Sequence, residues 1–388
     1  MTPDILMLSA AHPPEDVRIV QKEGAALAEA GFRVTHLAPG AAPPQAYGVE
    51  LRTFPPARGW RGRVLGIPAL ARRAAALGAA TIHAHEPDSW VAALLAARRT
   101  GARVVLDVHE HYPSRLDPGL PAPLRPLARA VLRLACRAVA ARADSVVVAK
   151  DGLDDAFGGP GHCTPVRNYA TPAAVAPRTH APGPLRLLHL GALGRSRGAF
   201  TMLESLVALP PDTRLVLIGR FTDGSEPEFR ARAAGLGVAH RIDTQPWMPR
   251  EAALAEAARC DIALVLFQPG VENHRLALPH KLFDAMLAGL PVIVPDFAEE
   301  VAAVVREAGC GIATNVADPA AVAAAVTILA DPAIRATLGA NARTAALGRF
   351  GWAGEAARLV ALHTHLRNCS LSREAGEGRG GGLSSASR

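Results

Sequence analysis

Aromatic residues, lysine and paired cysteines are scarce in this chain of 388 residues. Aromatic residues make up 4% of the sequence, and the only lysines are Lys22, Lys150 and Lys281. The five cysteines are scattered and form no Cys-x-x-Cys pair, which argues against a disulfide framework or a zinc site and favours a reducing compartment. We therefore expect a cytoplasmic protein, and each lysine becomes a candidate for function.

Several other signatures are absent. The sequence has neither the basic leader of a signal peptide nor the roughly 20 apolar residues of a spanning helix. Its formal net charge is +7, but no aromatic-interleaved basic cluster is present, so we expect no nucleic-acid partner. No Gly-x-Gly-x-x-Gly follows the first apolar run, and no Asp-x-Asp pair suits a divalent ion. We expect neither a metal nor a bound cofactor.

Short apolar runs alternate with helical stretches along most of the chain. Continuous runs are typical of parallel strands buried on both faces, so the sequence predicts repeated βαβ units of an α/β fold. The expected strands are residues 5–8, 32–37, 80–83, 104–108, 145–148, 185–190, 215–218, 262–266, 291–294 and 311–313. Ligands of such sheets bind at the carboxyl ends of the strands.

Prolines and length suggest where the domains divide. A chain this long suits two cores, and four prolines interrupt residues 171–184. We predict Rossmann-like domains at 1–170 and 185–345, joined by that linker. A helical segment at 346–367 is expected to pack back on the first domain, and the Gly/Ser/Arg-rich residues 368–388 are expected to form a disordered tail.

The most informative segment is Leu278-Pro-His-Lys-Leu-Phe-Asp-Ala-Met-Leu-Ala-Gly-Leu-Pro-Val-Ile293. A loop ending in proline enters a helix at His280, Lys281 and Leu282, whose free N–H groups and positive dipole end form an anion site. Lys281 adds a charge suited to a diphosphate, and Asp284 could accept hydrogen bonds from a ribose diol. The alternative is a solvated lysine and an aspartate favoured by the dipole.

This segment resembles the donor-binding stretch of the glycosyl transferases group 1 family, retaining GT-B enzymes that include sucrose synthases and bacterial mannosyltransferases. The match continues through 305–312, 317–319 and 338–343. The resemblance implies two Rossmann-like domains with parallel sheets facing across a cleft, the first on the acceptor side and the second binding a nucleotide sugar. Asp284 falls on the family's ribose-binding Glu.

A second stretch, 188–198, resembles the family's Gly-Arg-x-x-x-x-Lys-Gly turn, whose cations stabilise the departing diphosphate. Gly191 begins it, Ala192 replaces the Arg, Arg197 replaces the Lys, and Arg195 offers a second charge. Surface arginines in an Arg-rich protein are the alternative. Leu276 stands where many members carry a Glu that contacts the donor sugar.

Further residues are assigned by the same resemblance. The family places a His at the end of a first-domain strand, beside the reacting carbon, and His109 matches it. Trp247 follows a predicted strand near the expected base, although a packed aromatic is equally consistent. The expected catalytic residues are therefore His109, Arg197 and Lys281. The expected donor contacts are Asp284, His280, Leu282, Gly191, Arg195 and Trp247.

The opening loop resembles the family's acceptor loop. Its candidates for the acceptor side, with two from later loops, are His12, Asp16, Arg18, Glu110 and His85. His83 and His85 look like a zinc pair, but we expect them to point to opposite faces of their strand and to hold no metal. Arginines at 125, 129, 133 and 137 lie on one helix face. This is either a solvated face or a peripheral contact with an anionic membrane, at its inner side.

We therefore expect a metal-independent glycosyltransferase that moves a hexose-type sugar from a UDP- or GDP-linked donor to a hydroxyl with retention. The acceptor is left open between a lipid-linked glycan, a small molecule and a protein side chain. Two alternatives keep the fold: a nucleotide-sugar epimerase or phosphorylase, and a non-catalytic partner subunit, which Ala192 and Leu276 keep open.

Overall fold

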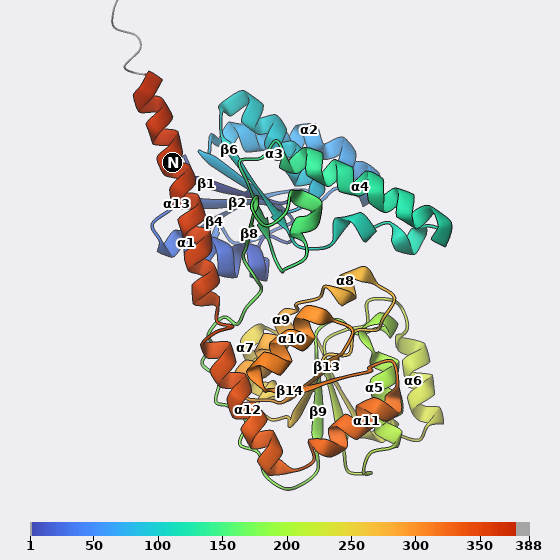
Figure 1. Ribbon diagram of the computed structural model, residues 1–388. Helices are drawn as coiled ribbons and strands as arrows, with labels where there is room; N and C mark the ends of the chain where they lie inside the picture. Colours follow the sequence, from blue (N-terminus) through green and yellow to red (C-terminus); the bar gives the residue numbers. More distant parts are fainter. Residues whose placement is uncertain (1, 378–388) are drawn as a thin grey trace, which may run out of the picture. The chain divides into compact units, whose positions relative to one another are not determined.

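The computed structural model describes residues 2–377 and consists of two α/β units (Figure 1). Unit 1 comprises Met1–Arg167 and Ala353–Arg388, and unit 2 comprises Asn168–Trp352. The expected linker, residues 171–184, lies within unit 2 and has no helix or strand. The chain thus leaves unit 1 once and returns to it through its last helix.

Unit 1 is built on one eight-stranded sheet of order β3-β4-β2-β1-β5-β6-β7-β8. All neighbouring strands are parallel except β3, which is antiparallel to β4. The strands are β1 (Ile5–Leu8), β2 (Val34–Pro39), β3 (Gln45–Ala46), β4 (Val49–Phe54), β5 (Thr81–Ala84), β6 (Arg103–Val108), β7 (Ser145–Val148) and β8 (Cys163–Pro165). The central strands are buried along their whole length, as expected for a sheet covered on both faces.

The helices of unit 1 follow its strands in the order that βαβ units require. They are η1 (Val17–Gly24, a π-helix), α1 (Ala25–Glu29), α2 (Gly59–Leu77), α3 (Pro87–Thr100), α4 (Arg125–Ala140) and α13 (Trp352–Glu377), with short 3₁₀ turns η2 (Tyr112–Ser114), η3 (Asp117–Gly119), η4 (Ala122–Leu124) and η5 (Asp154–Phe157). Helix α13 corrects the predicted tail: residues 368–377 are helical, because this single helix runs on past residue 367. Residues 378–388 of that tail lie outside the described part of the chain.

Unit 2 contains a six-stranded parallel sheet of order β11-β10-β9-β12-β13-β14. Its strands are β9 (Arg186–Leu190), β10 (Arg214–Ile218), β11 (Ile242–Gln245), β12 (Ile262–Leu264), β13 (Val292–Pro295) and β14 (Gly311–Thr314). Its helices are η6 (Arg195–Arg197), α5 (Ala199–Val207), α6 (Glu226–Gly235), η7 (Ala239–Arg241), α7 (Arg250–Ala257), α8 (Glu272–Arg275), α9 (His280–Leu287), α10 (Glu299–Ala308), α11 (Pro319–Ile328) and α12 (Pro332–Leu347). Both sheets match the predicted α/β class.

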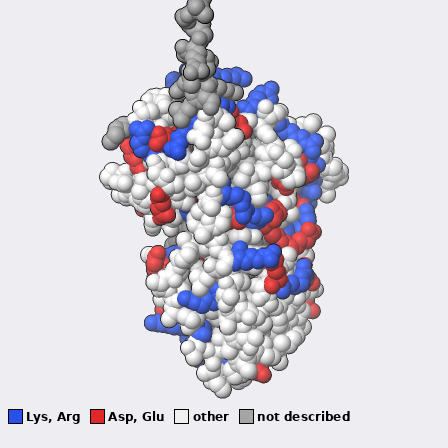
Figure 2. Space-filling view, turned by 60° about the vertical axis from the view of Figure 1, so that its left-hand side comes forward, with Lys and Arg blue, Asp and Glu red and all other residues white. Residues whose placement is uncertain are grey.

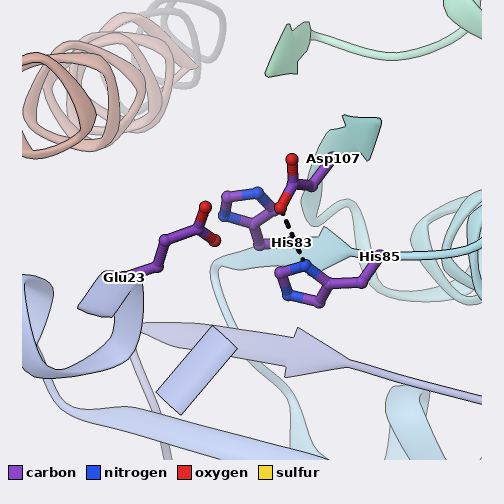
Figure 3. Close-up of side chains that lie close together, drawn as sticks. All are labelled: Glu23, His83, His85 and Asp107. Atoms are coloured by element: carbon purple, nitrogen blue, oxygen red, sulfur yellow. Dashed lines mark hydrogen bonds and ion pairs between the residues drawn. The ribbon is translucent and has the colours of Figure 1, made fainter. Parts of the chain in front are cut away.

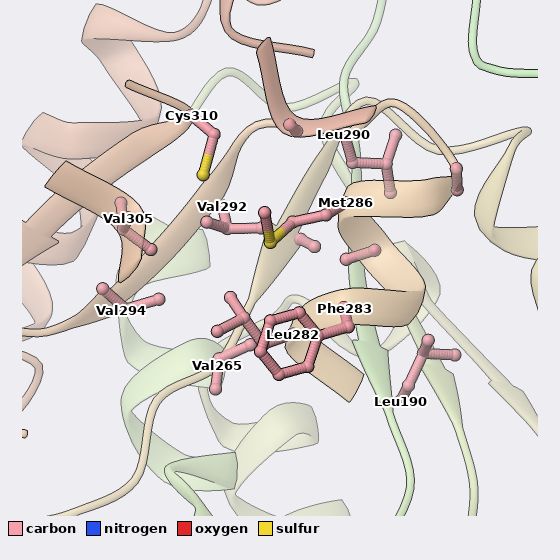
Figure 4. Packing of buried hydrophobic residues seen from close by; sticks show 14 of the residues in the cluster. Leu190, Val265, Leu282, Phe283, Met286, Leu290, Val292, Val294, Val305 and Cys310 are labelled. Carbon is pink, nitrogen blue, oxygen red and sulfur yellow. The ribbon is translucent and has the colours of Figure 1, made fainter. Parts of the chain in front are cut away.

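Two apolar clusters, one on each face of the sheet, form the core of unit 2. One joins α9, α10 and α12 to the sheet, and Figure 4 shows its centre around Phe283, Met286 and Val292. The other joins α5, α6 and α11 to the opposite face. Because Phe283 and Met286 lie on the buried side of α9, this helix is fixed against the sheet and its first turn is held in place.

Two features of the described residues concern the length of the helices and the distribution of surface charge. Among the described residues, no single helix is both long and apolar enough to cross a membrane, although α11 and α12 together meet the criterion as a pair bent by 96°. On the face shown in Figure 2, Lys and Arg are interspersed with Asp and Glu and much of the surface carries neither. No large area of this face carries charge of one sign alone.

Candidate functional site

Asp107, near the end of β6, is the centre of a buried hydrogen-bond network in unit 1. Its Oδ1 accepts from Arg18 Nη2 (2.9 Å), and its Oδ2 accepts from Arg18 Nε (3.1 Å). The same Oδ2 lies 3.1 Å from His85 Nδ1 and 2.8 Å from His109 Nε2. Burial alone would raise the pKa of Asp107, but Arg18, followed by His109 and His85, holds it well below its ordinary value. Asp107 is therefore an ionised carboxylate that joins two histidines.

Arg18 was expected to face an acceptor, and the structure places it elsewhere. Its side chain is 4% exposed, its Nη1 donates to Val166 O (2.9 Å), and its Nη2 lies 2.8 Å from Glu23 Oε1. Arg18 is thus the counter-ion of two buried carboxylates. Burial raises the pKa of Glu23 well above its ordinary value although Arg18 opposes the shift.

The expectation that His83 and His85 point to opposite faces was wrong. Residues two apart on a strand share a face, and the two rings lie with centroids 4.9 Å apart and planes inclined by 16°. Figure 3 shows them beside Glu23 and Asp107, and one atom from each of these four side chains lies within 4.8 Å of the others. Among the described residues, these four side chains carry donor atoms of the kind that bind metal ions. The cation that lies against the carboxyl groups of Glu23 and Asp107 is, however, the Arg18 guanidinium.

His85 was predicted to border the acceptor, and its burial contradicts this. The side chain is 0% exposed, and burial lowers its pKa to about 3 although Asp107 opposes the shift. His83 is also buried, and its Nδ1 lies 3.1 Å from Nε2 of His363 on α13. Both histidines are therefore neutral parts of the interior of unit 1. Between them they link the last helix of the chain to the carboxyl ends of β5 and β6.

The opening loop is held by the carboxylate of Glu86. Its oxygens accept hydrogen bonds from the backbone N–H groups of Ala10 (3.0 Å), Ala11 (3.0 Å) and His12 (2.9 Å). Asp16 caps η1 by accepting from the N–H groups of residues 18 and 19, and it lies 3.2 Å from His12 Nδ1. Burial would lower the pKa of His12, but Asp16 and Glu86 outweigh it and raise that pKa. His12 and Asp16 remain partly exposed, as an acceptor-side role requires.

His109 lies where this loop meets the buried network. Its side chain is 13% exposed, and its ring centroid is 4.9 Å from that of His12 and 5.5 Å from that of His85. Glu110, the next residue, pairs with Arg115. The structure therefore brings together four of the predicted residues, because His12 lies beside Asp16 and His109 lies beside both His12 and His85. The spacing of Asp107 and His109, two apart at a strand end, was the signal that could have revealed their contact.

In unit 2, two predicted cations lie against one aromatic ring. Arg197 Cζ is 5.3 Å and Lys281 Nζ is 5.7 Å from the centroid of Phe267, which is 2% exposed. Burial, and then the like charge of Arg197, lowers the pKa of Lys281 to about 7. Its Nζ lies 3.2 Å from Nε2 of His189, a neutral imidazole whose pKa burial lowers well below its ordinary value. Sequence analysis did not single out Phe267 or His189.

The other predicted donor contacts on α9 differ in exposure. Asp284 is partly exposed and pairs with Arg250, whose Nε donates to Asp284 Oδ1 (2.9 Å) and whose Nη2 donates to Thr171 O (2.9 Å). His280 is partly exposed at the first turn. The Leu282 side chain is 0% exposed and belongs to the core, so only its backbone can meet a ligand. Arg250 is a contact that the sequence did not predict.

The turn after β9 is built on glycines. A Cβ at Gly198 (φ +82°) would lie 2.3 Å from Leu266 O, whereas Gly191 (φ +93°) has open space on its Cβ side. Arg197, just before Gly198, is thereby fixed beside Phe267. Arg195 instead pairs with exposed Glu228 and lies over Phe200, so it is not part of the group around Phe267. The Ala192 carbonyl is 3.2 Å from His189 Nε2.

Two further predicted positions differ in burial. Trp247, in the loop after β11, is 67% exposed, which leaves its ring open to a ligand. Leu276, at the end of α8, is 9% exposed, and its neighbour His274 stacks on Phe267 with centroids 5.3 Å apart. Glu272 at the start of α8 pairs with Arg275 (2.6 Å).

Comparison with known proteins assigns this architecture. Residues 17–153 match the family described as Glycosyltransferase Family 4, and residues 174–345 match Glycosyl transferases group 1. The chain belongs to the glycosyl transferases group 1 family. This confirms the predicted family and the GT-B fold, and makes the protein a glycosyltransferase.

Solved structures share the fold at low identity. HepE of Anabaena, in complex with UDP, is 17% identical with a TM-score of 0.67 over 93% of this chain and 100% of its own. Sucrose-phosphate synthase of Thermosynechococcus elongatus is 18% identical with a TM-score of 0.70, over 94% and 99%. A Listeria monocytogenes protein provisionally named a UDP-N-acetylglucosamine 2-epimerase is 15% identical with a TM-score of 0.61, over 94% and 97%. No curated protein sequence matches this chain.

Proposed function

We propose that this glycosyltransferase transfers a hexose from a UDP- or GDP-linked donor to a hydroxyl acceptor, with retention at the anomeric carbon and without a metal ion. The observation that carries the proposal is the pairing of Arg197 and Lys281 on Phe267 at the first turn of α9. Two cations and a helix N-terminus at one place suit a diphosphate. The HepE structures, which contain UDP and UDP-glucose, support a donor of this class.

The chemistry follows from where charge develops. As the glycosidic bond to the donor breaks, negative charge grows on the departing diphosphate, and Arg197 and Lys281 stabilise it in the role that a divalent ion plays elsewhere. Asp284, held by Arg250, accepts hydrogen bonds from the ribose diol. Exposed Trp247 offers a stacking surface for the base. The family resemblance assigns His109 to the donor sugar.

Retention is proposed to proceed without a covalent enzyme intermediate. At the position of Leu276, where many family members carry a carboxylate, the side chain is apolar and buried. Glu272 is engaged with Arg275, and Asp107 is enclosed by Arg18 and two histidines. The hydroxyl acceptor therefore attacks on the face that the leaving group vacates, and the departing phosphate oxygen takes its proton.

The test is turnover followed by NMR. The full-length protein is incubated with UDP-, GDP- and dTDP-hexoses, and we expect slow release of one nucleoside diphosphate with water as acceptor and a free sugar of unchanged anomeric configuration. Lys281→Ala should abolish release, whereas Arg195→Ala, in the turn that carries Arg197 but paired with Glu228, should not. A changed sugar without net transfer would favour an epimerase, and no turnover with no binding would favour a non-catalytic subunit.

We further propose a peripheral contact with an anionic membrane through α4. Half of the residues of this helix are exposed, including Leu127 (65%), Val131 (57%) and Leu134 (66%), and arginines border this apolar face. Aliphatic side chains flanked by guanidinium groups suit an anionic lipid surface. Co-sedimentation with vesicles containing phosphatidylglycerol should be lost in Leu127→Ser/Leu134→Ser and kept in the matched pair Val207→Ser/Ile328→Ser. Equal binding by both pairs, or none by the parent protein, would contradict this.

A further inference from the structure

We propose that His189 is a positioning residue for Lys281. Its Nε2 accepts a hydrogen bond from the ammonium group of Lys281 and so holds that cation beside Arg197, where it can bind an anionic diphosphate. The inference rests on the proposed function only for the identity of the anion. The contacts that carry it lie entirely within unit 2.

The His189 ring is fixed by the sheet on which it lies. His189 is the last but one residue of β9, and its side chain is fully buried. Its Nδ1 is 3.2 Å from the carbonyl oxygen of Leu264, which ends the neighbouring strand β12. Its Nε2 is 3.2 Å from Lys281 Nζ and 3.2 Å from the carbonyl oxygen of Ala192. Because two strands and a turn surround the ring, Nε2 presents a fixed partner to Lys281.

The contacts of the ring select one tautomer. Burial, followed by the charge of Lys281, lowers the pKa of His189 well below its ordinary value, so the ring is neutral and carries one N–H. With the proton on Nδ1, the ring donates to Leu264 O and accepts from Lys281 at Nε2. With the proton on Nε2, the ring could donate only to Ala192 O, and its N–H would face the ammonium group. The first arrangement makes two hydrogen bonds where the second makes one.

Lys281 needs a partner that holds it in place without cancelling its charge. Within residues 2–377 no carboxylate pairs with its ammonium group, and Arg197, on the same Phe267 ring, repels it. A lysine side chain has four flexible carbons, so the repulsion would turn the ammonium group away unless a contact opposed it. A carboxylate would oppose it but would also compete with the diphosphate. A neutral imidazole holds the cation and leaves its charge for the ligand.

Two substitutions separate the roles of the two ring nitrogens. The amide of Asn lies close to the position of Nδ1, and the longer Gln brings its amide close to that of Nε2. His189→Asn therefore keeps a donor for Leu264 O and loses the acceptor for Lys281, whereas His189→Gln supplies that acceptor and loses the donor. Only a positioning role predicts that Gln restores what Asn removes. The control is His180→Asn, the same change at a histidine of unit 2 that bonds Gly289 O.

The direct readout is the Lys281 side chain, which can be observed because the chain has only three lysines. In full-length protein labelled with ¹³C at lysine Cε, the signal that disappears in Lys281→Met belongs to Lys281. A side chain held in one rotamer shows two distinct Hε resonances, whereas free rotation averages them. We expect two resonances in the parent protein, in His189→Gln and in His180→Asn, and one averaged resonance in His189→Asn. An averaged resonance in the parent, or the same result for His189→Asn and His189→Gln, would overturn the inference.

Anion binding and the tautomer complete the test. In calorimetric titrations with inorganic pyrophosphate at pH 6.5, Kd should rise roughly tenfold in His189→Asn and less than about threefold in His189→Gln and His180→Asn. An equal rise in His189→Asn and His189→Gln would contradict the inference. If the parent protein binds neither pyrophosphate nor a nucleotide sugar, the proposed function fails, while the lysine spectra still decide the positioning role.

The tautomer requires no substitution at His189, so it decides the question even if the variants of this buried residue do not fold. In long-range ¹H–¹⁵N spectra of protein labelled at histidine, the imidazole whose Nε2 signal shifts in Lys281→Met is that of His189. We expect its proton on Nδ1. A proton on Nε2 would overturn the inference, because that nitrogen could then accept nothing from Lys281.

Discussion

The lowered pKa of Lys281 predicts a specific pH dependence of donor binding. Burial and Arg197 bring that pKa to about 7, so the ammonium form is about nine-tenths populated at pH 6 and about one-tenth at pH 8. A diphosphate binds the charged form. Apparent affinity falls with the populated fraction, so Kd for a nucleotide sugar should rise about tenfold between these two pH values.

The ligand and the variants isolate this effect. A nucleotide sugar has no terminal phosphate whose second pKa lies near neutrality, so its own charge stays constant. Calorimetric titration at pH 6, 7 and 8 should therefore report on the protein. Lys281→Arg keeps a charge at every pH and should flatten the profile, whereas Lys281→Met should bind weakly throughout. A flat profile in the parent protein, equal to that of Lys281→Met, would refute the reasoning.

Two further predictions concern the same unit. Asp284→Ala should weaken binding of a nucleotide sugar roughly tenfold but leave the binding of inorganic pyrophosphate unchanged, because Asp284 is assigned to the ribose. Equal loss of both ligands in competition titrations would contradict that assignment. Gly198→Ala places a Cβ 2.3 Å from Leu266 O at φ +82°, so it should lower the free energy of unfolding by about 1–3 kcal/mol in urea denaturation. Gly237→Ala, at φ +71° with open space, should cost less, and an equal loss in both would show that the close contact is not the cause.

Periodicity and composition predicted the sheets well because the strands are continuous apolar runs. β1 and β7 begin and end where their runs do, at Ile5–Leu8 and Ser145–Val148. Short or amphipathic strands such as β3 and β8 carry too few apolar residues to stand out. The helical residues 368–377 were missed because a single helix extends into a polar stretch that composition alone assigns to a tail.

The interior of unit 1 could not be predicted in the same way. The Asp107 network joins side chains from η1, β5 and β6, and its contacts depend on the register that pairs His83 with Val105. Arg18 was assigned to the acceptor side because a residue's direction within a π-helix cannot be read from its position in a loop motif. His83 and His85 were misplaced by a misapplied strand period, and with the correct period they would have been predicted on one face.

In unit 2 the motif located the residues but not their partners. Lys281 and Arg197 were chosen from the helix start and the glycine turn, and the structure places both beside Phe267. That ring lies in the segment after β12, 14 residues before Lys281 in sequence, and nothing in its own surroundings marks it. The pairing of Asp284 with Arg250 spans 34 residues and likewise depends on how α7 packs on α9.

The most direct test of the account is a titration of the full-length protein with UDP-glucose and GDP-mannose at pH 6.5, repeated with an Arg197→Ala/Lys281→Ala variant. The account predicts that one donor binds with a single site and that the double variant loses this binding while Arg195→Ala retains it. Unchanged binding in the double variant, or tight binding that Arg195→Ala abolishes, would show that the cations beside Phe267 do not hold the diphosphate.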